Sequence, residues 1–231
     1  MRIAIHFDAI CPWCFIGERR LAQALALRPA LKPAILWRPY FLNPDLPDTG
    51  VDFSVYVERK FGGAQRAKRL LASLAEIGNA VGIPFDFGAI RRVPPTLDAH
   101  VLIRLAHRFG RQTEVAAAVF SAHFTQGLDI GDRAELARIG IAAGLGETRI
   151  AEAFDDAATI EALRAEAENA QRSGTLGVPL FVIDDAFTIT GAHEAEVLVR
   201  LLDVAAAGEE AALTREANFT PPLRRSPPES P

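Results

Sequence analysis

The feature that most constrains this chain is a single short motif, Cys11-Pro12-Trp13-Cys14, which holds the only two cysteines in the sequence. An apolar run typical of a buried strand, residues 3–7, precedes it, and a run typical of a helix, residues 15–27, follows it. The spacing therefore predicts that a helix begins within the motif itself, directly after a strand.

The order of residues within the motif suits a helix N-terminus. Pro12 fits the first helical position, because its φ angle is already fixed and its missing N–H would have had no partner there. Cys11 then becomes the N-cap, where unpaired N–H groups and the helix dipole stabilise a thiolate and lower the pKa. Cys14 falls inside the first turn. We expect an exposed, attacking Cys11 and a more buried, resolving Cys14.

Composition excludes several classes of partner. The net charge is −4 and no stretch is strongly basic, so a nucleic-acid partner is not expected. No apolar run reaches the roughly 18 residues of a membrane span. Met1 leads almost directly into the first predicted strand, so we expect no signal peptide and a cytoplasmic protein. A structural disulfide is rare in that compartment, which favours a catalytic or metal-binding role for the motif.

The order of predicted elements indicates a sheet domain interrupted by helices. Strands are predicted at 2–7, 34–37, 177–183 and 187–190, with the second parallel to the first and Asp184-Asp185 as a hairpin turn. Apolar residues recur at helical spacing between them, and a last helix is predicted over 194–206. The prediction is an α/β thioredoxin fold made of residues 1–50 and 158–208, an all-helical insertion over 51–157, and a flexible tail over 209–231.

Four segments in this order resemble the DsbA family of thiol–disulfide oxidoreductases, in particular its FrnE-like branch. They are residues 8–17, 37–44, 177–182 and 190–192. This branch shares a superfamily with 2-hydroxychromene-2-carboxylate isomerases and kappa-class glutathione transferases. The resemblance implies that Cys11 is the nucleophile and that Pro179 is cis and faces the motif. It implies no required metal or organic cofactor, with glutathione as a possible co-substrate.

The chain departs from its glutathione-dependent relatives at two places. Those relatives carry a serine nucleophile or lack the second cysteine, whereas this chain has both Cys11 and Cys14. Some also place Ser-Asp after the glycine that matches Gly191, where this chain has Ala192-His193. We therefore do not expect strong, transferase-like glutathione binding.

The predicted site has a centre and a rim. Cys11 and Cys14 are the predicted catalytic residues, and Pro12, Trp13, Val178 and Pro179 are expected to form the substrate groove, with the Val178 backbone offered to a bound peptide. The rim is predicted to contain Asp8, Phe41, Asn43, Gly191, Ala192 and His193. For Asp8 a turn-capping role is favoured over proton relay.

Three functions remain open on the sequence. The first is disulfide exchange with a thiol- or disulfide-containing protein or small molecule. The second is a glutathione-dependent isomerase of the 2-hydroxychromene-2-carboxylate type, and the third is a non-catalytic binding or chaperone module. A zinc site is not predicted, because the five histidines are scattered and none has ligand spacing to the cysteines. Oligomeric state and redox direction are not predicted.

Overall fold

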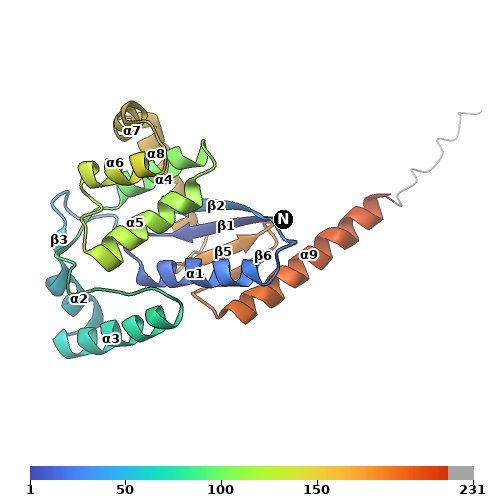
Figure 1. Ribbon diagram of the computed structural model, residues 1–231, viewed down its shortest axis with the longest axis horizontal. Helices are drawn as coiled ribbons and strands as arrows, with labels where there is room; N and C mark the ends of the chain where they lie inside the picture. Colours follow the sequence, from blue (N-terminus) through green and yellow to red (C-terminus); the bar gives the residue numbers. More distant parts are fainter. Residues whose placement is uncertain (218–231) are drawn as a thin grey trace, which may run out of the picture.

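A four-stranded sheet of order β2-β1-β5-β6 forms the centre of the computed structural model, which describes residues 1–217, with backbone alone for 209–217 (Figure 1). The strands are β1 (Arg2–Phe7), β2 (Ala34–Pro39), β5 (Leu180–Ile183) and β6 (Phe187–Thr190). β1 pairs with β2 in parallel and with β5 antiparallel. The predicted crossover and hairpin are confirmed, and Asp184 and Asp185 both have the positive φ angles of the turn.

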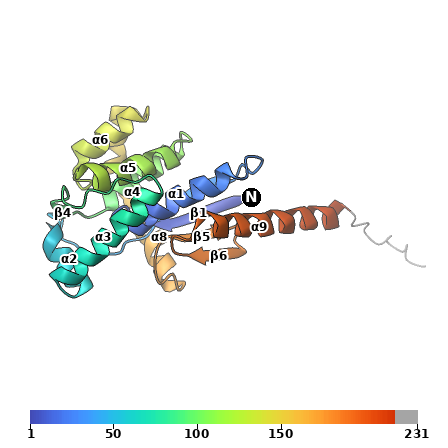
Figure 2. The same cartoon turned by 60° about the horizontal axis from the view of Figure 1, so that its bottom comes forward.

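Helices make up most of the rest of the described chain. They are α1 (Pro12–Ala26), α2 (Phe53–Phe61), α3 (Ala64–Ala80), α4 (Leu97–His107), α5 (Gln112–Gln126), α6 (Arg133–Ala142), α7 (Glu147–Phe154), α8 (Ala157–Arg172) and α9 (Ala195–Ala217). α1 packs against α9. Figure 1 shows α4 to α8 gathered away from α9, and Figure 2 shows α4, α5 and α6 together on that side. α3 packs against α1, and α2 packs against α3.

The prediction that residues 51–157 are all helical is wrong in one detail. Two short strands, β3 (Val51–Asp52) and β4 (Arg92–Val93), form an antiparallel pair within this stretch. Each is two residues long, which is too short for the alternation of apolar and polar residues that reveals a strand. The pair joins the two ends of the α2–α3 segment.

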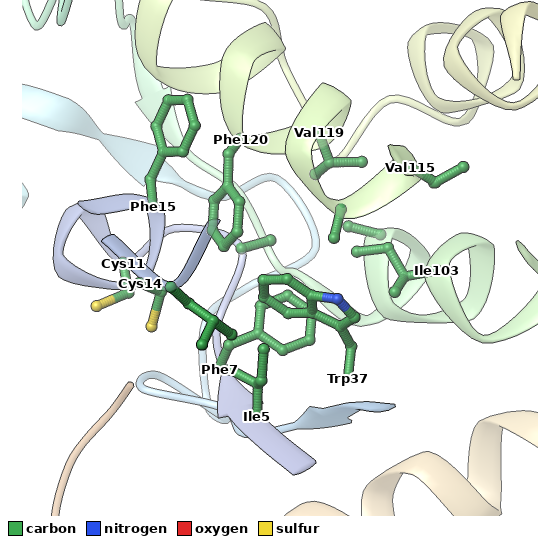
Figure 3. Close-up of a cluster of buried hydrophobic side chains, with 14 of the residues drawn as sticks. Ile5, Phe7, Cys11, Cys14, Phe15, Trp37, Ile103, Val115, Val119 and Phe120 are labelled. Atoms are coloured by element: carbon green, nitrogen blue, oxygen red, sulfur yellow. The ribbon is translucent and has the colours of Figure 1, made fainter. Parts of the chain in front are cut away.

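One face of the sheet carries the core. Ile3, Ile5 and Phe7 alternate along β1 and are all buried on the same side, where Ile183 and Phe181 of β5 lie directly opposite Ile3 and Ile5. In Figure 3, side chains of α1 and α5 lie close to this face of β1. The N-terminal half of the chain thus meets its C-terminal half in a single core.

The C-terminal helix is longer than predicted. α9 continues through Ala217, beyond the predicted end at residue 206, so residues 209–217 of the predicted tail are helical; residues 218–231 lie outside the described part of the chain. The segment after residue 206 is rich in alanine and glutamate, which favour helix and extend it. Among the described residues, no helix is long and apolar enough to cross a membrane.

Candidate active site

α1 begins at the motif as the sequence predicts. Cys11 is the N-cap, with φ −96° and ψ 110°, and Pro12 is the first helical residue. The Cys11 carbonyl accepts hydrogen bonds from the backbone N–H groups of Cys14 at 3.0 Å and Phe15 at 3.4 Å. Cys11 therefore closes the first turn through its backbone, and its sulfur lies at the positive end of the helix.

The expected contrast in exposure between the cysteines is wrong. Cys11 is 4% exposed and Cys14 is 1% exposed, so both are buried, because the segment around Val178 covers the start of α1. Both are free thiols, and Figure 3 shows their side chains projecting to the same side. Burial, reinforced by a hydrogen bond to Cys11, raises the pKa of the Cys14 thiol well above its usual value.

The chain crosses the motif again near residue 178. The Cys11 thiol donates to the Val178 carbonyl oxygen over 3.7 Å, and the Val178–Pro179 peptide bond is cis. α1 approaches this segment closely because residue 17 is glycine. A Cβ atom at Gly17 would lie 2.9 Å from Pro179 Cγ and 3.2 Å from Phe181 Cζ.

Beside Cys11 lies a cavity of about 230 Å³ with a mainly apolar wall. Cys11, Pro12, Trp13, Gly177 and Val178 form one part of this wall, and Trp13 is the exposed member of the motif at 37%. The rest of the wall consists of Ile10, Leu42, Phe53, Tyr56, Val57, Lys60, Phe61, Leu70, Leu71, Leu74, Phe87, Val93, His123 and Phe124. The motif thus opens into a small, largely apolar cavity.

Two predicted rim residues lie outside this cavity. Phe41 and Asn43 line a separate hollow, while Leu42 between them lines the cysteine cavity. The Phe41 ring lies 5.3 Å from the His100 ring, and Asn43 Nδ2 donates to the Tyr56 hydroxyl at 3.0 Å. Neighbouring side chains of an extended segment point to opposite sides, and the sequence did not reveal which of the three points inward.

The predicted rim at residues 191–193 is also outside the cavity wall. Gly191 N–H donates to the Pro179 carbonyl at 2.7 Å, and Ala192 O accepts from the Arg20 guanidinium. The His193 ring is exposed, with Nε2 2.9 Å from Thr190 O. The turn at residues 191–193 therefore contacts Pro179 through a backbone hydrogen bond and does not line the cavity.

Asp8 is buried and connects two segments. One of its carboxylate oxygens accepts from Leu42 N at 2.7 Å, and the other accepts from Ile10 N at 3.4 Å and lies 3.9 Å from His100 Nε2. The favoured turn role fits the bond to Ile10. The bond to Leu42 adds something that the sequence did not predict, since it fixes a residue of the cavity wall to the turn before the cysteines.

The sequence did not predict that residues of α2, α3 and α5 form much of the cavity wall. The helical spacing of apolar residues predicted a helix here, but not that Leu70, Leu71 and Leu74 line the cavity. His123 of α5 is 1% exposed, and burial lowers its pKa to about 4, so it is neutral at neutral pH. Aromatic residues at helical spacing in α2 were the available signal.

The described residues contain no cluster of three or more His, Cys, Asp or Glu side chains that could hold a metal ion.

Comparison with known proteins agrees with this geometry. A probable DsbA oxidoreductase from Streptomyces coelicolor has a structure that matches with a TM-score of 0.80 and 27% identity, covering 98% of this chain and 94% of that one. The cytosolic disulfide reductase DsbM from Pseudomonas aeruginosa, also solved with GSH, matches at 0.63 and 22%, covering 93% and 100%.

A 2-hydroxychromene-2-carboxylate isomerase matches with a TM-score of 0.65 and 15% identity, covering 95% of this chain and 100% of that one. A family model described as the DSBA-like thioredoxin domain matches residues 2–203, which include the motif, the helices of the cavity wall and the segment around Pro179. The chain has a thioredoxin fold and belongs to the DSBA-like thioredoxin domain family.

Proposed function

We propose that this protein is a thiol–disulfide oxidoreductase that exchanges disulfides through Cys11 and Cys14. The observation that carries the proposal is the position of Cys11, which caps α1 in the wall of a cavity while Cys14 lies buried beside it. The helix N-terminus stabilises negative charge on the first sulfur. The raised pKa keeps Cys14 protonated, so Cys14 does not compete as the first nucleophile.

In the reducing direction, the Cys11 thiolate attacks a substrate disulfide and forms a bond to one substrate sulfur, while the other sulfur leaves as a thiolate. The leaving thiolate takes the Cys14 proton. Cys14 then attacks the Cys11 sulfur, which breaks the mixed disulfide and releases the second substrate thiolate. The substrate gains two electrons and the cysteine pair becomes a disulfide. An external thiol such as glutathione reduces it again, and the oxidising direction is the same sequence reversed.

The test is to trap the mixed disulfide. Cys14→Ala removes the resolving thiol, so adducts with protein thiols or glutathione are expected to accumulate on Cys11 and to appear on non-reducing gels and by mass spectrometry. Cys11→Ala is the matched control and is expected to accumulate none. Equal adduct levels in the two variants would contradict the mechanism.

The apolar wall of the cavity favours one further candidate, the glutathione-dependent isomerisation of a small aromatic compound. Turnover of 2-hydroxychromene-2-carboxylate in the presence of glutathione distinguishes it from disulfide exchange. A non-catalytic binding module would instead keep its cellular effect in the double variant Cys11→Ala/Cys14→Ala. The cytoplasmic location stays a prediction.

A further inference from the structure

The cavity beside Cys11 has one positively charged side chain in its wall at neutral pH. Burial keeps His123 neutral by lowering its pKa, so Lys60 is the one lining side chain that carries a positive charge. Glutathione would bring two carboxylates and an ammonium group into a wall that offers little to pair with them. The cavity therefore suits a molecule, or part of a molecule, whose one charged group is an anion.

The ammonium group of Lys60 is held in place on α2. Tyr56 and Lys60 are four residues apart on the same face of this helix, and Lys60 Nζ donates to the Tyr56 hydroxyl at 2.6 Å. The same hydroxyl receives the hydrogen bond from Asn43 at 3.0 Å, which fixes its position from the other side. Lys60 forms no ion pair with any carboxylate of the described chain, so its other N–H donors are available to a ligand.

The apolar part of the cavity sets the shape of the ligand. Phe53, Phe61 and Phe87 line it together with leucines of α3. An apolar cavity of about 150 Å³ accommodates one benzene ring, so about 230 Å³ accommodates one substituted ring. The sulfur of Cys11 lies in the same wall and supplies the reactive group.

We propose that this site acts on small aromatic thiols and disulfides that carry a carboxylate, and that Lys60 is the residue that selects the carboxylate. The inference rests on the proposed function, since Cys11 must be the nucleophile. The Cys11 thiolate forms a bond to the aryl sulfur, the substrate disulfide breaks, and the second aryl group leaves as a thiolate. The carboxylate is neither made nor consumed.

The experiment compares two aromatic disulfides by stopped-flow absorbance with the reduced protein. Bis(carboxynitrophenyl) disulfide carries carboxylates and dipyridyl disulfide carries none. For Lys60→Met, the ratio of the first rate constant to the second is expected to fall about fivefold, the effect of losing one ion pair to an exposed lysine. Lys60→Arg keeps the charge and is expected to restore most of the ratio.

Arg59→Met is the matched control, because Arg59 is the exposed neighbour of Lys60 and does not line the cavity. It is expected to keep the wild-type ratio. A ratio that is unchanged in Lys60→Met, or that falls equally in Arg59→Met, would overturn the role of Lys60 and leave disulfide exchange intact. If the Cys11→Ser variant reacts with both disulfides as fast as the wild type, the proposed function fails as well.

Discussion

Two regions rich in aromatic and aliphatic side chains meet at the Cys11–Cys14 motif, and they differ in how closely those side chains pack. Between α1, β1 and α5, Phe15 and Phe120 stack with their ring centroids 5.3 Å apart, and Phe7 packs edge-on against Trp37 at 4.7 Å (Figure 3). All of these rings are at most 2% exposed. On the α2–α3 side, aromatic and leucine side chains surround a cavity instead of filling one another's space.

The two regions give the two cysteines different surroundings. Cys14 belongs to the filled region, and burial there raises the pKa of its thiol. Cys11, three residues earlier, lines the cavity of the second region. On one side of the motif the apolar side chains fill the space between them and stabilise the fold. On the other side they leave a cavity through which a ligand could reach Cys11.

The largest expected effect tests whether the two regions differ in stability. Phe120→Ala removes a ring that contacts Phe7, Phe15 and Trp37, and is expected to lower the free energy of unfolding by about 3–5 kcal/mol. Phe53→Ala, in the partly buried cavity wall, is expected to cost about 1 kcal/mol. Urea denaturation measures both. Equal losses of unfolding free energy in the two variants would contradict the claim that the two regions differ in packing.

The next prediction concerns the pH dependence of stability, which reports whether the cavity wall keeps water away from His123. His123 has a pKa of about 4 in the folded protein, against an ordinary value of 6.5, because it is buried. Between these values the unfolded chain binds a proton that the folded chain does not. The neutral His123 ring therefore makes its full contribution to the free energy of unfolding above pH 6.5. This contribution falls by about 3 kcal/mol in total as the pH is lowered towards 4.

Denaturation of the wild type and of His123→Gln across this pH range isolates that contribution, since the variant keeps His6, whose pKa is also lowered by burial. The wild type is expected to lose more stability on acidification than the variant. Parallel pH profiles would mean that water reaches the His123 ring.

The smallest effect concerns the sheet-facing side of α1. Gly17→Ala places a Cβ atom 2.9 Å from Pro179 Cγ, and the cost of this crowding is expected to exceed the gain in helix propensity by about 1 kcal/mol. Gly208→Ala is the matched control in α9, because no atom lies within 4 Å of a Cβ there. It is expected to stabilise the protein slightly. Thermal unfolding of both variants gives the comparison, and stabilisation by Gly17→Ala would contradict close packing.

The sequence predicted what depends on neighbours along the chain. The N-cap position of Cys11 follows from Pro12, and the hairpin at Asp184 and Asp185 follows from turn chemistry. It did not predict the burial of Cys11, because the covering segment around Val178 comes from the other end of the chain. The thioredoxin fold was also predicted correctly, because the spacing of apolar residues reveals each strand and helix separately.

The cavity wall was the least predictable part. Periodicity marks Leu70 and Leu74 as apolar but does not say whether another side chain fills the space in front of them. The inward direction of Leu42 depends on the hydrogen bond that it forms with Asp8, which no pattern in the sequence encodes. Lys60 lacked a signal because a lone lysine on an exposed helix face is usually only solvated.

The contact between Cys11 and Val178 also has a consequence during biosynthesis. The two residues are 167 positions apart, so at synthesis rates of 5–20 residues per second the cysteines emerge roughly ten to thirty seconds before the segment that covers them. For that interval both thiols belong to a nascent chain without its completed pocket. The chemistry proposed for Cys11 would therefore begin only when the segment around Val178, in the last quarter of the chain, has joined the sheet.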